Sequence, residues 1–185
     1  MIPRSMPKTS ARIRFSATLH RPAGNAPGEA WTFLVLPKAA SAQLPSRGLA
    51  LVEGTLNGAP FEAALDPDGQ KSHWLKVSRK LGAAAGATAG DTVTLELAHS
   101  DREPTVPADL QQALAAAPKA RAGWADLTVG ARTDWIHWII SAKSEKTRAS
   151  RIAGACDMLA KGKRRVCCFD RSGFYSKSFS APKAE

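Results

Sequence analysis

The residues best suited to chemistry lie in one basic stretch of the sequence, WIHWIISAKSEKTRASR. In this stretch Lys143, Thr147 and Arg151 recur every four residues, which places them on one face of a helix, and Arg148 lies beside them. Two cations with a hydroxyl group between them can bind a phosphate or a carboxylate. The same spacing is typical of a solvent-exposed helix face, on which Glu145 would pair with Arg148. Both interpretations stay open.

The distribution of charge supports an anionic partner. The chain of 185 residues carries a formal net charge of +10 and has a sequence pI of about 10.0. Residues 1–104 hold 12 Lys and Arg against 9 Asp and Glu, a net charge of +3, whereas residues 105–185 hold 14 against 7, a net charge of +7. A basic cluster, KGKRR at 161–165, adds to this excess. We therefore expect an anionic ligand or protein partner, with nucleic acid as one candidate.

The sequence contains none of the local signatures of common enzymes. There is no GxSxG, GxxxxGK[ST] or GxGxxG pattern, and the histidines His20, His73, His99 and His137 form no metal-binding spacing. The carboxylates near the DPDG sequence at 66–69 are explained by turn chemistry. We therefore expect no catalytic residue, no metal and no cofactor, while an enzyme with an unrecognised site stays an alternative.

The three cysteines, Cys156, Cys167 and Cys168, are odd in number and include no CxxC pair. We expect reduced, structural thiols, although Arg164 and Arg165 could activate the neighbouring pair. No apolar run approaches the roughly 20 residues that a membrane-spanning helix needs. The sequence therefore predicts a cytoplasmic protein without membrane insertion.

The elements that must position these residues begin with β-strands. Residues 11–19 alternate strictly between apolar and polar side chains, and residues 30–36 are almost continuously apolar. Asn57-Gly58, between two apolar runs, predicts a hairpin with a type I′ turn. Strands are predicted at 11–19, 30–36, on both sides of Asn57-Gly58 within 48–64, at 72–77 and at 91–97. A short helix capped by Ser78 should lie among them, so the N-terminal half is expected to be a small β-barrel or rolled sheet.

The hydrophobic periodicity changes to that of helices after the polar residues 99–106. Helices are predicted over 107–117, around Trp124, from Thr128 onwards and over about 145–161. Trp124, Trp135 and Trp138 are expected to supply apolar contacts between the two units, and His137 to lie on the flank opposite the buried tryptophan stripe. The predicted organisation is a flexible tail at 1–10, a barrel at 11–98, a helical domain at 107–165 and an arm or weak hairpin at 166–185.

These motifs resemble two known bacterial families. The strand Phe15 to Leu19, the strand Trp31 to Pro37, the hairpin Gly54 to Gly58 and the Gly90-Asp91 turn resemble an N-terminal domain of unknown function. The sequence P-x-D-L-x-x-A-L from Pro107 and the basic stretch resemble the bacteriocin-protection, YdeI/OmpD-associated family. In that second motif the matching residues are Trp138, Ile139, Ala142, Lys143, Thr147, Arg148, Arg151 and Ile152.

The resemblance implies an α+β fold, with an N-terminal double-split β-barrel of about six strands and one short helix, followed by a small helical unit. It also implies a non-enzymatic bacterial protein for binding or stress tolerance. The alternative is a nucleic-acid-binding regulator that uses the basic C-terminal helices, since the barrel is similar in shape to AbrB-like barrels.

Overall fold

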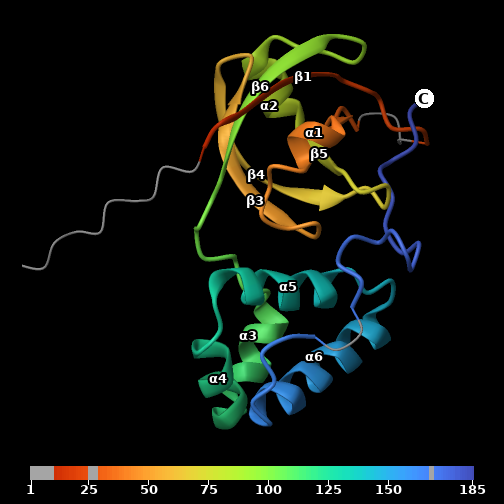
Figure 1. Ribbon diagram of the computed structural model, residues 1–185. Helices are drawn as coiled ribbons and strands as arrows, with labels where there is room; N and C mark the ends of the chain where they lie inside the picture. The colour runs from red at the N-terminus through yellow and green to blue at the C-terminus, as the bar shows by residue number, and fades with distance from the viewer. Residues whose placement is uncertain (1–10, 25–28, 167–168) are drawn as a thin grey trace, which may run out of the picture.

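The computed structural model describes residues 11–24, 29–166 and 169–185 (Figure 1), so the tail predicted at 1–10 lies outside the described residues. Strands dominate the chain up to residue 99, and helices follow. The first part contains β1 (Ile13–Thr18), β2 (Thr32–Val35), α1 (Lys38–Ser41), β3 (Ala50–Leu56), β4 (Ala59–Pro67), β5 (His73–Val77), α2 (Arg79–Ala85) and β6 (Thr92–His99). The second part contains α3 (Ala108–Ala115), α4 (Pro118–Ala125), α5 (Val129–Ile140) and α6 (Glu145–Ala160).

The six strands form one antiparallel sheet in the order β1-β6-β3-β4-β5-β2. This order places β1 and β2 at the two edges. An isolated bridge joins the edges, because His20 and Phe33 exchange backbone hydrogen bonds of 2.8 and 2.9 Å. The sheet is therefore a nearly closed barrel, and the predicted α+β fold with an N-terminal barrel and C-terminal helices is confirmed.

The hairpin at Asn57-Gly58 has the predicted turn. Both residues have positive φ, 48° and 84°, and Leu56 pairs with Ala59 across the two strands. The Asn57 side chain also accepts a hydrogen bond of 2.9 Å from the backbone N–H of Thr94 on β6. The turn therefore closes the hairpin and also ties its end to β6.

Gly54 allows β3 and β6 to cross closely. A Cβ atom at this position would lie 1.8 Å from the carbonyl oxygen of Glu96, far inside van der Waals contact. Beneath this crossing the barrel core is closely filled, since Leu56, Leu95 and Leu97 have no exposed surface. Only glycine fits at position 54 without moving the β6 backbone.

Side-chain caps set the beginnings of three helices. The hydroxyl oxygens of Ser78, Thr128 and Ser144 accept backbone N–H hydrogen bonds at the starts of α2, α5 and α6. Pro118 both ends the preceding helical stretch and begins α4, because proline is compatible with the first helical turn. α1, which follows Pro37, is too short to show a periodicity and was not predicted.

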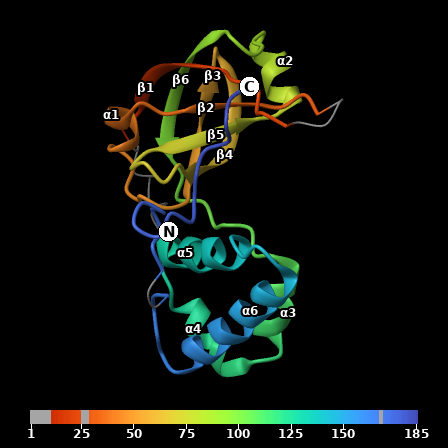
Figure 2. The same cartoon turned by 90° about the vertical axis from the view of Figure 1, so that its right-hand side faces the viewer.

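α3 to α6, called the helical unit below, enclose a second hydrophobic core, separate from that of the barrel. Trp135 is fully buried at its centre, and Trp124 and Trp138 pack against the same cluster. The three tryptophans that were expected at the junction thus belong to the core of the helical unit. α5 is the helix that lies next to the barrel in both views (Figures 1 and 2).

Residues 169–185, called the arm below, run back from the helical unit to the barrel (Figure 2). Arg171 forms an ion pair of 2.9 Å with Asp134 of α5, and the Phe179 ring stacks on His137 with centroids 4.9 Å apart. Farther along, the Lys183 carbonyl accepts a hydrogen bond of 2.8 Å from the N–H of Ala23. Within residues 169–185 the arm contains no regular strand, only an isolated bridge to the barrel. The weak hairpin considered from the sequence begins at Val166 and includes residues 167–168, which lie outside the described residues.

Candidate functional site

Three of the four residues proposed from the basic stretch line one cavity of about 380 Å³, called the α6 pocket below. Lys143 lies in the turn between α5 and α6, whereas Thr147 and Arg151 lie on the first two turns of α6. The remaining walls come from the end of α5 and from the arm. They consist of Trp138, Ser141, Phe169, Asp170, Ser176, Ser178 and Phe179.

The Arg151 guanidinium is held in place at this pocket. Its Nη1 donates hydrogen bonds to the Trp138 carbonyl, at 2.5 Å, and to the Ser141 hydroxyl, at 3.2 Å. Its Cζ atom lies 5.4 Å from the centroid of the Trp138 ring, within the range of a cation–π contact. A guanidinium fixed in this way loses little further conformational freedom when it binds an anion.

The Lys143 ammonium group and the Thr147 hydroxyl complete the polar wall. The Thr147 hydroxyl accepts a hydrogen bond of 3.0 Å from Ser144, the N-cap of α6, so its position is fixed by the start of the helix. Lys143 is exposed, and within residues 11–24, 29–166 and 169–185 it has no ion-pair partner. Arg151 likewise forms no ion pair with the described residues, so neither cation of the pocket is neutralised in this way.

Asp170 is the carboxylate in the pocket wall, and it is used by the arm itself. Its two oxygens accept hydrogen bonds from the backbone N–H groups of Ser172, Tyr175 and Ser176 and from the Ser172 hydroxyl. Burial acts to raise the pKa of Asp170, but these hydrogen bonds outweigh it and lower the pKa to about 2. The carboxylate therefore folds the arm and closes one side of the pocket.

Arg148, the fourth proposed residue, does not line the pocket. It forms a bidentate ion pair with Asp109 of α3, with distances of 2.7 and 3.0 Å. Hydrogen bonding from Arg148 lowers the pKa of the Asp109 carboxyl. Arg148 thus pairs with a residue of another helix and not with Glu145 of its own helix. The pair joins α6 to α3.

His137 is placed by the tertiary structure in a way that the helical pattern does not predict. It lies on the flank of α5 away from Trp135, as expected, but the arm covers that flank and leaves His137 only 3% exposed. Burial, with a smaller contribution from His73, lowers the pKa of His137 to about 4. Its Nδ1 is buried and has no hydrogen-bond partner among the residues that the structure describes. Neutral imidazole is therefore the native form.

A serine–histidine pair in the barrel was not predicted, because its members are 32 residues apart. The Ser41 hydroxyl lies 2.6 Å from Nδ1 of His73, and Nε2 of His73 lies 2.7 Å from the Gly48 carbonyl. Both side chains are fully buried. Burial also lowers the pKa of His73. This pair fixes α1 and the Gly48 loop to β5. Because both side chains are buried, a substrate cannot reach them.

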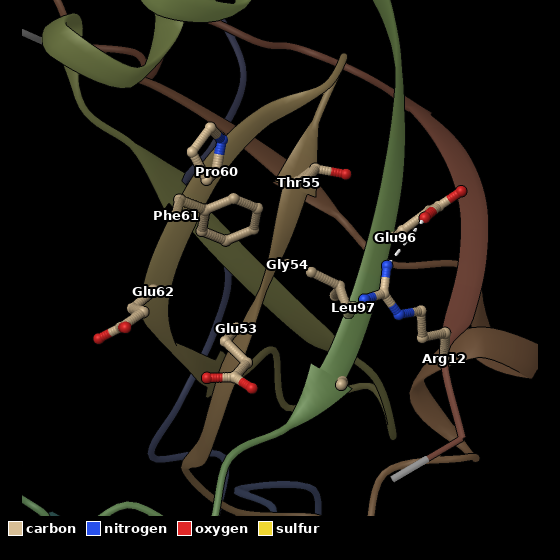
Figure 3. A pocket seen from close by; sticks show the side chains of 10 residues that line it. Arg12, Glu53, Gly54, Thr55, Pro60, Phe61, Glu62, Glu96 and Leu97 are labelled. Carbon is tan, nitrogen blue, oxygen red and sulfur yellow. Dashed lines mark hydrogen bonds and ion pairs between the residues drawn. The ribbon is translucent and has the colours of Figure 1, made fainter. Parts of the chain in front are cut away.

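A further hollow of about 540 Å³ lies on the outer surface of the barrel (Figure 3). Gly54 forms its floor, and the Phe61 ring points from β4 towards it (Figure 3). Glu96 pairs with Arg12 at 3.5 Å, and Glu62 pairs with Arg102 at 2.5 Å. The charges around this hollow are thus largely compensated within the chain.

The remaining predictions concern the cysteines, metal binding and membrane-spanning helices. Cys156 is a free, partly buried thiol, and burial raises its pKa. Cys167 and Cys168 lie outside the described residues. Among the residues that the structure describes, no three His, Cys, Asp or Glu side chains form a group that could hold a metal ion, and no helix is long and apolar enough to cross a membrane.

The fold and the pocket define a two-part protein, a β-barrel followed by a helical unit with a cationic pocket. Residues 15–97 match the family model of the domain of unknown function DUF1905, and residues 103–162 match the family described as Bacteriocin-protection, YdeI or OmpD-Associated. These two matches confirm the resemblance seen in the motifs. A comparison with curated proteins gives no match.

Proposed function

We propose that this chain is a non-enzymatic binding protein of bacterial stress tolerance, and that its α6 pocket holds an anionic group of the ligand or partner. One observation carries the proposal: Lys143, Thr147 and Arg151 line a single cavity together with Trp138. The family match associates the helical unit with bacteriocin protection at the level of the family. Binding without chemistry is favoured because the groups in the pocket are suited to holding an anion.

The chemistry of the pocket suits a phosphate or a carboxylate. Arg151 offers a fixed guanidinium, Lys143 adds an exposed ammonium group, and Ser176 and Ser178 bring further hydroxyl groups from the arm. The aromatic rings of Trp138 and Phe179 line the same cavity and would contact an apolar part of the ligand. A volume of about 380 Å³ is adequate for a small organic anion or for one charged side chain of a partner.

The experiment is isothermal titration of the full chain with pyrophosphate. We expect binding whose affinity falls at least tenfold in Lys143→Ala and in Arg151→Lys, since a lysine cannot reproduce the fixed guanidinium fork. Arg148→Ala is the matched control: it removes the same charge three residues from Arg151, but this side chain is paired with Asp109 and should leave the affinity unchanged. Equal losses in all three variants would contradict a defined pocket and indicate general charge attraction.

The alternative function, nucleic-acid binding by the basic helices, is tested with the same variants. Phosphate-driven binding to mixed-sequence duplex DNA should weaken by orders of magnitude between roughly 50 and 200 mM salt. We expect no tight binding at the lower salt concentration, because the cations of the pocket face a cavity with an aromatic wall. Tight, salt-sensitive binding that the Lys143 and Arg151 substitutions abolish would replace our proposal with the regulator hypothesis.

A further inference from the structure

A different cavity, of about 370 Å³, lies between the barrel and the helical unit, and we call it the junction cavity. Its barrel side includes Leu49 and Leu51, and its helical side includes Leu127 and the first turn of α5. Leu49 and Leu127 are almost fully buried. The cavity therefore has an apolar base that both parts of the molecule supply, and cavities of this size between structural units are common ligand sites.

Three arginines from two segments converge on the polar side of this cavity: Arg164 and Arg165, which follow α6, and Arg171 from the arm. All three also line a smaller adjoining cavity of about 220 Å³. Asp134 forms an ion pair with Arg171, and Asp101, the other carboxylate in the wall, lies 3.4 Å from the His99 ring. No ion-pair partner is found for Arg164 or Arg165 in the described part of the chain. Two guanidinium groups are thus available to an anion.

The fold builds this cluster in a defined position. The Trp135 indole N–H donates a hydrogen bond of 3.2 Å to the Arg164 carbonyl, which fixes the chain where it leaves α6. Gly48 of the barrel makes room for the arm, because a Cβ atom there would lie 2.8 Å from Cβ of Arg171. Burial raises the pKa of Asp134, although Arg171 and Arg165 oppose the rise. The Asp134 carboxylate is thus partly desolvated beside the Arg171 guanidinium.

We propose that the junction cavity is a second binding site, for a small organic anion whose phosphate or carboxylate contacts Arg164 and Arg165 and whose apolar part lies against Leu49, Leu51 and Leu127. This site is separate from the α6 pocket and shares no lining residue with it. A ligand bound there contacts both the barrel and the helical unit. Its binding therefore stabilises their association.

The test uses phenyl phosphate and inorganic phosphate on the full chain, with amide NMR and calorimetry. Phenyl phosphate should bind at least tenfold more tightly than phosphate, because its ring occupies the apolar base. It should shift the amide signals of Gly130 and Ala131, which line the cavity at the start of α5. The Arg164→Ala and Arg165→Ala variants should each lose about tenfold in affinity while their circular dichroism spectra stay unchanged.

Lys163→Ala is the matched control, because it removes a neighbouring cation of the same basic cluster that does not line the cavity. An equal loss of affinity in this variant would overturn the proposal in favour of general charge attraction. If Lys143→Ala abolished binding and the arginine variants did not, phenyl phosphate would occupy the α6 pocket. That outcome would refute the junction site and support the proposed function. Equal affinities for phenyl phosphate and inorganic phosphate would refute the apolar part of the site.

Discussion

In the barrel and in the helical unit alike, one glycine allows two backbones to approach closely, but the two parts differ in what surrounds that contact. In the barrel, Gly54 lies against the Glu96 carbonyl within a sheet whose edges are themselves bridged. In the helical unit, Gly123 of α4 lies against the Leu159 carbonyl of α6, where a Cβ atom would be 2.6 Å away. Rigid strand pairing holds the first contact, whereas side-chain packing around Trp135 holds the second.

The two parts obtain their stability from different kinds of contact. Hydrogen bonds between neighbouring strands run around the barrel, and leucines fill its interior. The helical unit has a smaller core, and the arm covers one flank of α5 through Phe179 and Arg171. We therefore expect the barrel to resist local changes until it fails as a whole, and the helical unit to respond gradually.

The largest expected effect comes from Gly54→Ala. The added methyl group would displace the β6 backbone, so we expect a loss of about 4 kcal/mol or more in unfolding free energy, or failure to fold. Gly123→Ala should lose less, roughly 1–3 kcal/mol, because two packed helices can shift apart. Urea denaturation followed by circular dichroism measures both. A Gly54→Ala loss no greater than that of Gly123→Ala would refute the contrast between a rigid and an adjustable part.

A second prediction uses low pH to test the contact between α5 and the arm. The pKa of His137 is lowered from 6.5 to about 4, so the unfolded state binds its proton more readily. Protonation of His137 in the unfolded state therefore does not lower the free energy of unfolding above about pH 6.5. As the pH falls to about 4, it lowers the free energy of unfolding by roughly 3 kcal/mol in total. In His137→Phe that loss should disappear, whereas His20→Gln should retain it.

The measurement is the unfolding free energy of each variant at intervals between pH 4 and 7, taken as a difference from the parent protein. The difference is needed because burial raises the pKa of Asp66 to about 6, which makes stability fall as the pH rises over much of the same range. Subtraction removes the contribution of Asp66. A parent protein and a His137→Phe variant with parallel pH profiles would show that the arm does not keep His137 neutral.

The smallest effect is expected from Gly154→Ala in α6. Of the described residues, a Cβ atom there would meet the Trp138 ring, at 3.9 Å, which is an ordinary contact. Because alanine is favoured over glycine inside a helix, the substitution should raise the unfolding free energy by about 0.5–1 kcal/mol. Thermal denaturation detects such a gain as a higher midpoint. A lower midpoint would indicate that α6 is packed as tightly at this position as α4 is at Gly123.

The local elements follow from the amino-acid sequence alone. Alternating side chains predicted the strands, the Asn57-Gly58 pair predicted the turn, and Thr128 predicted the start of α5, because each of these signals depends on neighbours within a few residues. The four-residue spacing also predicted that Lys143, Thr147 and Arg151 lie on one side of the chain. Thr147 and Arg151 are on α6, Lys143 is in the turn before it, and all three line the α6 pocket.

Contacts between side chains that are distant in the sequence depend on the packing of whole elements. Arg148 pairs with Asp109, 39 residues away, so its charge is used to join two helices. His137 is buried because the arm folds back over α5, and no pattern within α5 records that contact. Arg164 and Arg165 were only a basic cluster in the sequence, but the turn after α6 directs them to the junction cavity. Helical and strand periodicities specify the face on which a residue lies, whereas the partner of that face depends on how whole elements pack.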